Sequence, residues 1–591
     1  MKAGAKLHQV VSGYPLHMVQ QYVVDADEMM AFCDEIINAG SLKGYRRAES
    51  VSSSRRELVP FGAAAQDDGG MSFGEEDVKP VEAQADPNDP NAKILAEGKA
   101  LYEQKKFDEA SLLFYKVLQT SDPSAELFHG EAQYELGKTL YKMKLYQGAL
   151  SYFGKIVEVG ETHPFFIPTL RGLVLLTDEV PEDPLLMERL AAYRDYVNDV
   201  PEKYRDRFSY LVGRYLYSQL EVDAALKLLD SVTPRSPDYA KARYIAGVTH
   251  VAAYAAEPAV AAFKDVLRVL TAKKEEGTLT DDEKKLYELT NLGMARVFYS
   301  TGQYDQSLKY YGRISRRSAM WPTALFESSW AYFQVDQYNK ALGNLHSLNS
   351  PFFSDQYFPE GPILSAVIFF YNCKYERVRN TLDEFMFEYE PVLGEVQAVL
   401  ASKAEDPEAM YEWLLQVRDG AANPELAQVA NTALDDQQIK NKLLLLEAIQ
   451  TELETIEDMP KAWKSSGLAS TLLQDNTLAA SFAKSDAGTL AVQRLERVSR
   501  ELQDFILEQE KILFEVLRAE RGEIQADLRS EMQVSADVTK KPKVEVSDEE
   551  LYWTFDGEYW RDELGTFQYT MTKGCIQRDT ANRTIQASES N

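Results

Sequence analysis

The chain has 591 residues, too many for one compact core but suitable for several domains or one extended solenoid. Its 45% of hydrophobic and 27% of charged residues allow folding over most of the length, which excludes a wholly disordered chain. The 64 basic and 93 acidic residues give a net charge of −29, whose field repels phosphate backbones and anionic membrane surfaces. We therefore expect no nucleic acid partner.

The first 45 residues form a short N-terminal segment, in which residues 22–37 predict one helix. Residues 46–91 are rich in Ser, Gly, Pro and acidic residues and predict a disordered linker. The first twenty residues lack the apolar core and cleavage site of a secretory signal, and no run of 18 apolar residues occurs. We expect a cytoplasmic chain without a transmembrane segment. The pair Arg55-Arg56 followed by LVPFGAAAQ leaves open a different start and export to the periplasm or cell envelope.

Residues 92–391 repeat one order of small and large residues. A small residue in a first segment is followed by a second small residue and then by large apolar ones, which is typical of two helices in close contact. Two pairs of corresponding residues, Gly213 with Gly247 and Ala295 with Ser329, lie 34 positions apart. The expected repeat-packing residues are Gly98, Ala110, Gly137, Ala149, Gly213, Ala225, Gly247, Ala259, Ala295, Ser307, Ser329, Ala341 and Ala366.

This order resembles the tetratricopeptide repeat (TPR), a family whose 34-residue unit is two antiparallel helices. The resemblance implies about eight hairpins over residues 92–391, stacked into a curved solenoid with first helices on its concave side. The spacing from Gly247 to Ala295 is longer, at 48. It contains the polar stretch TAKKEEGTLTDDEKK, where we expect an inter-repeat loop and a break or bend near residues 271–285.

Residues 392–535 predict longer helices with two apolar stripes. The first stripe ends at Ile456 and the second begins at Leu495, on a helix expected from Thr489 to Met532. An antiparallel coiled-coil hairpin explains both stripes, and pairing between chains into a homo-oligomer is the alternative. The predicted fold class is therefore all-α: a TPR-type α-solenoid followed by a long-helix antiparallel coiled-coil region.

Residues 536–591 combine a polar linker with an aromatic-rich tail. Aromatic rings at this density need burial, either against the coiled-coil hairpin or the last repeat, or against a partner. The candidate partner anchors are Trp553, Tyr559 and Trp560. The tail is similar to segments in large TPR proteins of the Gram-negative envelope of myxobacteria and other deltaproteobacteria, including some linked to gliding motility.

Motifs for chemistry are not found. The sequence contains no GxxxxGK[ST], GxSxG or HExxH motif and no strand followed by GxGxxG, its six histidines are scattered, and its three cysteines lack CxxC spacing. We therefore expect no catalytic residues, no cofactor, no metal and no enzymatic activity.

Five polar residues on the predicted first helices are candidate partner-binding positions, although each one also suits simple solvation of the groove: Lys99, Lys138, Arg214, Arg296 and Asn372. We predict a protein-protein interaction scaffold that holds a protein or peptide in a TPR groove and helps assemble a multiprotein complex. The acidic balance favours a basic or amphipathic partner. The alternatives are a structural component of a cell-envelope or gliding-motility machine and, from another class, a helical-repeat hydrolase, for which the sequence offers no acid.

Overall fold

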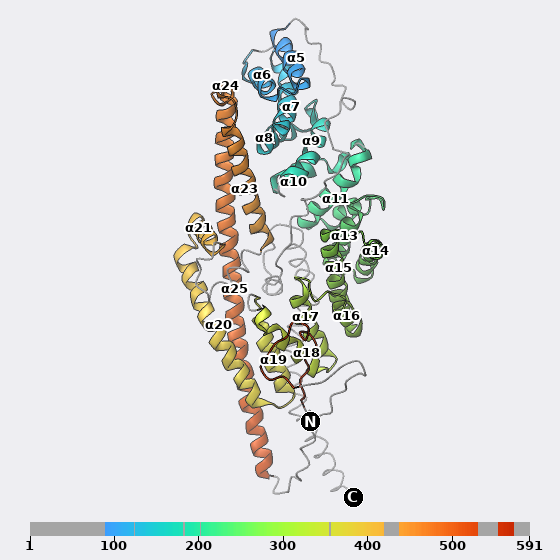
Figure 1. Ribbon diagram of the computed structural model, residues 1–591, viewed down its shortest axis with the longest axis vertical. Helices are drawn as coiled ribbons and strands as arrows, with labels where there is room; N and C mark the ends of the chain where they lie inside the picture. Colours follow the sequence, from blue (N-terminus) through green and yellow to red (C-terminus); the bar gives the residue numbers. More distant parts are fainter. Residues whose placement is uncertain are drawn as a thin grey trace.

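The computed structural model describes residues 89–122, 125–180, 184–200, 202–353, 356–418, 436–529 and 554–571. Within these ranges the protein is all-α and contains no strand. The helices follow a curved path along one side of an elongated molecule, and one long helix runs along the other side (Figure 1). The expected N-terminal segment, the linker up to residue 88 and Trp553 lie outside the described residues.

Eight consecutive helical hairpins occupy the described part of residues 90–403. The first four pair α5 (Pro90–Glu103) with α6 (Phe107–Gln119), α7 (Glu126–Lys142) with α8 (Tyr146–Val159), α9 (Phe166–Glu179) with α10 (Pro184–Ala191), and α11 (Glu202–Ser218) with α12 (Val222–Leu229). The next four pair α13 (Tyr239–Ala252) with α14 (Ala256–Glu275), α15 (Asp281–Ser300) with α16 (Tyr304–Tyr311), α17 (Trp321–Gln334) with α18 (Tyr338–Leu348), and α19 (Glu360–Tyr371) with α20 (Tyr375–Lys403). These tandem hairpins form a helical-repeat solenoid.

Seven of these hairpins turn in the same way. One residue adopts a left-handed backbone conformation two positions before the second helix begins, which stops the first helix and reverses the chain. Only Gly302 among them is a glycine, and its φ is 72°. The other residues in this conformation are Lys105, Lys144, Leu220, Tyr254, Asp336 and Cys373.

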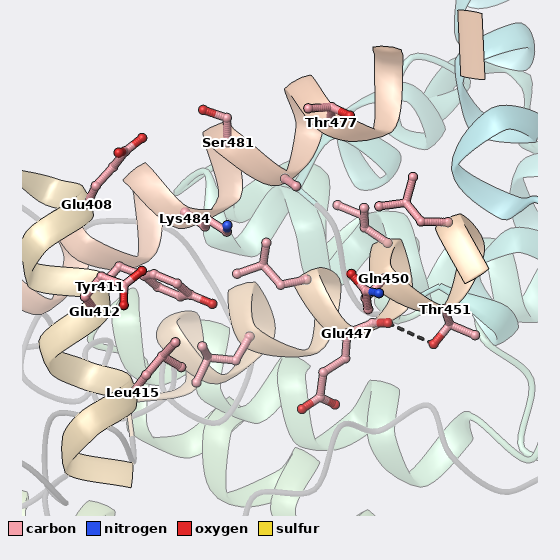
Figure 2. Close-up of a pocket in the computed structure, with 15 residues that line it drawn as sticks. Glu408, Tyr411, Glu412, Leu415, Glu447, Gln450, Thr451, Thr477, Ser481 and Lys484 are labelled. Carbon is pink, nitrogen blue, oxygen red and sulfur yellow. Dashed lines mark hydrogen bonds between the residues drawn. The ribbon is translucent and has the colours of Figure 1, made fainter. Parts of the chain in front are cut away.

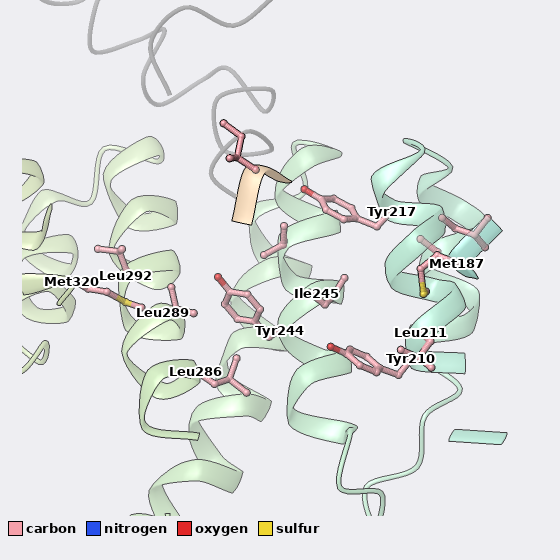
Figure 3. Close-up of a cluster of buried hydrophobic side chains, with 14 of the residues drawn as sticks. Met187, Tyr210, Leu211, Tyr217, Tyr244, Ile245, Leu286, Leu289, Leu292 and Met320 are labelled. Atoms are coloured by element: carbon pink, nitrogen blue, oxygen red, sulfur yellow. The ribbon is translucent and has the colours of Figure 1, made fainter. Parts of the chain in front are cut away.

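Glycine on a first helix lets an aromatic ring of the second helix approach closely. A Cβ added to Gly98 would lie 2.6 Å from Phe114 Cε1, and one added to Gly137 would lie 2.6 Å from Phe153 Cε1. The small residues opposite, including Ala110 and Ala149, are fully buried. Neighbouring hairpins then stack through apolar side chains of their first helices, as Figure 3 shows for α11, α13 and α15. The labelled side chains on these three helices are Tyr210, Leu211, Tyr217, Tyr244, Ile245, Leu286, Leu289 and Leu292, and the figure also labels Met187 of α10 and Met320, the residue before α17.

The expected inter-repeat loop is present but shorter than the polar stretch, because it covers only residues 276–280. Helix α14 continues to Glu275 and α15 begins at Asp281, so most of the polar stretch extends two helices. A capping box starts α15, in which Thr280 accepts from the backbone N–H of Glu283 at 3.2 Å while the Glu283 carboxylate accepts from Thr280 N at 3.0 Å. Lys273 also pairs with Glu283 across the turn. The charges that suggested a loop instead stabilise the two helix ends.

The C-terminal helices differ from the expected ones in length and pairing. Helix α25 spans Gly467–Arg529, which is 63 residues, and therefore begins well before Thr489. Only the short α24 (Lys461–Lys464) separates it from α23 (Gln437–Glu457). The N-terminal half of α25 packs on α23 through Leu445, Ile449 and Ala483.

The second half of α25 packs on α20 and α19. The expected hairpin required the apolar stripe that begins at Leu495 to face α23. The stripe instead faces the last repeat. Helix α20 makes this possible because it continues through Pro391 to Lys403 and supplies a long apolar partner.

Helices α23 to α25 join the two ends of the solenoid. At the N-terminal end of the solenoid, Trp463 contacts α6 and Glu452 contacts α8. Near its end, Arg379 of α20 pairs with Glu520 of α25 at 2.7 Å. Figure 1 shows α25 running alongside α23, α21 (Pro407–Arg418) and α20. The solenoid and the long helix thus form a closed frame.

The described part of the tail, residues 554–571, folds back on α17, α18 and α19. Leu564 is fully buried there, and Tyr569 N donates to Asn339 O at 3.1 Å. None of the helices in the described residues combines the length and apolar composition that a membrane span requires.

Candidate partner-binding site

Two of the five polar candidates form ion pairs between successive first helices. Lys99 of α5 pairs with Glu131 of α7. Arg296 of α15 holds Glu327 of α17, with Nε 2.9 Å from Oε2, and both side chains are largely buried. Tyr311 also donates to Glu327, at 3.0 Å. These cations stabilise the stacking of neighbouring repeats.

The other three candidates are engaged within their own region of the solenoid. Lys138 donates to Glu135 at 3.0 Å and lies over the ring of Tyr102, with Nζ 5.2 Å from its centroid. Arg214 is 5% exposed, and Asn372 is 3% exposed and donates to Ile368 O at 2.8 Å. The partner-binding role of these residues stays a prediction, and their geometry is that of packing residues.

The two candidate anchors in the described tail differ in exposure. Tyr559 packs on His346, with ring centroids 5.1 Å apart. Its hydroxyl lies 3.5 Å from His346 Nδ1. Trp560 is 58% exposed and therefore keeps a large apolar surface in solvent.

A pocket of about 800 Å³ lies between α21, α23 and α25. Figure 2 shows Glu408, Tyr411, Glu412 and Leu415 entering from α21, with α23 and α25 on the other sides. Its apolar lining is Leu415, Leu443, Leu446, Ile449, Leu453 and Ala480. Its polar lining is Glu408, Tyr411, Glu412, Glu447, Gln450, Thr451, Thr477, Ser481 and Lys484.

The chemistry of this pocket is amphipathic and acidic. Three exposed carboxylates, Glu408, Glu412 and Glu447, stand against one lysine, Lys484, so the lining carries more negative than positive charge. The apolar side chains come mostly from one face of α23. Such a pocket suits the apolar face of a helix or peptide whose flanking residues are basic.

Sequence reasoning missed this pocket because it had not recognised α21 as a separate helix. Three buried residues of α21, Met410, Leu414 and Val417, follow a helical spacing that was visible in the sequence. Helix α21 packs on α25 at Gly488, in the part of α25 before Thr489 that was expected to be a connection and not a helix.

Glu452, between two pocket residues on α23, faces the solenoid and caps α8. Its carboxylate accepts from Gln147 N at 2.7 Å, Gly148 N at 3.1 Å and Asn476 Nδ2 at 3.2 Å. Burial raises the pKa of Glu452, and these hydrogen bonds oppose the rise. Its role is structural, since its acceptor oxygens are directed to the first turn of α8.

Groups of three or more His, Cys, Asp or Glu side chains able to hold a metal are absent from the described residues. No protein-family model matches the chain, and no curated protein sequence matches it. Among the solved structures that match, a circular tandem repeat protein with novel repeat topology and enhanced subunit contact surfaces matches over 74% of this chain and 90% of its own. The identity is 12% and the TM-score is 0.12, too low for any argument from that structure. The description as a helical-repeat fold rests on the eight described hairpins themselves.

Proposed function

We propose that this protein is a tetratricopeptide-like scaffold that binds a protein or peptide and helps assemble a multiprotein complex. The pocket between α21, α23 and α25 is the proposed contact site, and its apolar floor below an acidic rim is the observation that carries the proposal. Helical-repeat solenoids commonly present extended surfaces to other proteins.

The closed frame supports this function by holding the pocket walls in place. Helix α25 packs on α21 so closely that a Cβ added to Gly488 would lie 1.9 Å from Pro407 O. Helix α23 also packs on α25, through contacts that include Leu445 of α23 and Ala483 of α25. A preformed pocket loses little conformational entropy on binding.

The proposed partner segment is a basic amphipathic helix or peptide. Its apolar side would cover Leu446 and Leu453, and its cations would lie near Glu412 and Glu447. The net charge of −29 on the whole chain would also speed the approach of a basic partner.

Affinity capture with the full-length chain from the native cell extract at low salt tests the proposal. The variant Glu412→Lys/Glu447→Lys reverses the charge of the rim, where both side chains are exposed. The matched control Glu457→Lys/Glu510→Lys makes the same charge change at exposed positions of α23 and α25 outside the pocket. We expect the wild type and the control to retain the same discrete proteins and the rim variant to lose them. Equal retention by the rim variant would reject the pocket, and no retention by any form would reject the scaffold.

A further inference from the structure

The aromatic tail is seated on a defined surface of the solenoid, distinct from the pocket. This surface, here called the tail face, is formed by Trp321, Asn339, Gly343, His346, Ser347 and Phe369 of α17, α18 and α19. Residues 554–571 cross it without forming a helix or a strand. The contacts are therefore those of a non-helical peptide on a helical surface, with turns at residues 561–566.

His346 is the centre of the aromatic contacts. Its ring centroid lies 4.7 Å from that of Phe555, 4.9 Å from that of Phe567 and 6.1 Å from that of Tyr569. Both the Phe555 and Phe567 rings meet the imidazole edge to face, at interplanar angles of 87° and 85°. One side chain of α18 thus contacts several aromatic residues of the segment.

The tail face also binds the backbone of the segment. Asn339 accepts from Tyr569 N through its carbonyl oxygen at 3.1 Å and from Met571 N through Oδ1 at 3.2 Å. Ser347 Oγ accepts from Gly565 N at 2.8 Å. Pairing of backbone groups with fixed acceptors is one way in which proteins bind non-helical peptides.

Two glycines, one on each side of the contact, are required for this fit. A Cβ added to Gly343 of α18 would lie 1.7 Å from Phe567 O, and its three nearest atoms all belong to the tail backbone. Gly565 of the tail has a φ of 77°, and an added Cβ would lie 2.8 Å from Trp321 Cζ2. Helix α18 by itself would favour alanine at position 343. The surface and the segment are therefore shaped for one another.

The segment buries little of itself on this surface. Leu564 is its one fully buried residue among those described, while Phe555 is 44% and Trp560 is 58% exposed. Contacts with so little burial open easily. The covalent link to α25 compensates by raising the effective concentration of the segment.

We propose that the tail face is a recognition site for a turn-containing, aromatic-rich peptide of a partner protein, and that residues 554–571 occupy it as a displaceable intramolecular ligand. The ligand class follows from the observed occupant: aromatic residues on both sides of a Leu-Gly turn. This site is separate from the acidic pocket, so its test is independent of the proposed function.

Fluorescence anisotropy with a labelled synthetic peptide of residues 554–571 and the full-length protein tests the proposal. Gly565→Ala in the chain weakens the intramolecular ligand and leaves the tail face unchanged, so the peptide should bind this variant about tenfold or more tightly than it binds wild type. The double variant Gly343→Ala/Gly565→Ala closes the tail face and should lose the peptide. Gly394→Ala, at a position in α20 with no neighbouring atom within 4 Å, is the matched control and should bind like wild type.

Hydrogen exchange verifies that the variants are folded. In Gly343→Ala the amides of Tyr569 and Met571 should lose protection, while α18 should keep its own. Equal peptide affinity for wild type and Gly565→Ala, or retained affinity in the double variant, would overturn the proposal. A tail-dependent dimer of the wild type that Gly343→Ala abolishes would also overturn it, because the occupant would then be a second copy of the chain.

Discussion

The indole Nε1 of Trp463 donates a hydrogen bond to Ser111 Oγ at 2.9 Å, joining residues 352 positions apart. Both side chains are buried, at 1% and 0% exposure. The bond fixes the turn between α23 and α25 to the second helix of the first hairpin. It is therefore one of the contacts that close the frame.

Replacement of Trp463 should break the contact between α24 and α6. Trp463→Ala removes a fully buried indole, and we expect the free energy of unfolding to fall by about 3–5 kcal/mol. Urea unfolding followed by circular dichroism measures the change. Trp560→Ala removes the same side chain from a position that is 58% exposed and should change stability by less than about 0.5 kcal/mol. Equal effects of the two variants would contradict the closed frame.

Glu452, which caps α8, should make the free energy of unfolding depend on pH. Burial raises its folded-state pKa above the ordinary value of 4.5, so the folded protein holds the proton more tightly than the unfolded chain. Its contribution is therefore most favourable below pH 4.5 and declines as the pH rises through the folded-state pKa. Glu452→Gln cannot ionise. The stability of this variant relative to wild type should rise between about pH 4.5 and pH 7, and a flat difference would contradict the assignment.

The ion pair at the other end of the frame should contribute less. Arg379 and Glu520 are 41% and 28% exposed, so solvent screens their attraction. A double-mutant cycle of Arg379→Ala and Glu520→Ala should give a coupling of about 0.2–1 kcal/mol that weakens as salt is added. A coupling as large as the loss from Trp463→Ala would mean that electrostatics, and not burial, holds the frame.

The close approach of helices within a hairpin should make Gly137 intolerant of substitution. A Cβ there would lie 2.6 Å from the fully buried ring of Phe153, and Gly137→Ala should cost about 1–3 kcal/mol. Gly394→Ala, in the open part of α20, should instead stabilise the protein by up to about 1 kcal/mol. Thermal unfolding of the two variants gives the comparison, and a gain from Gly137→Ala would contradict the packing.

The hairpins were accessible from sequence because their packing is local. Small residues such as Gly137 and Ala149 belong to one hairpin, so their order appears along a short stretch of chain. The all-α solenoid follows from the same order. The turns were equally local, although left-handed residues such as Lys144 and Leu220 gave no compositional signal, since they are not glycines.

The pairing of the long helices was not accessible in this way. Residues 467–488 contain alanine and serine at positions where larger apolar residues would mark a stripe, and Ala483 packs on Ile449 only because small residues allow close contact. An apolar stripe on one helix also does not indicate which other helix packs against it. The stripe from Leu495 packs on α20, whose extension beyond residue 391 was not expected.

The candidate site was predicted least well because polar side chains depend on neighbours from other repeats. Arg296 was chosen as a groove cation, but its partner Glu327 lies on the next first helix. The acidic pocket needs three helices, of which α21 and the start of α25 were not recognised. The order of residues along the chain does not show directly which distant helices bring their side chains together.

Site-specific photo-cross-linking from the pocket tests the central claim most directly. A photoreactive amino acid at Gln450, an exposed residue of the pocket lining, is compared with one at Glu510, an exposed residue outside it. The account predicts that Gln450, and not Glu510, cross-links to a discrete basic protein in the native cell. No adduct from Gln450, or the same adducts from both positions, would contradict partner binding in this pocket.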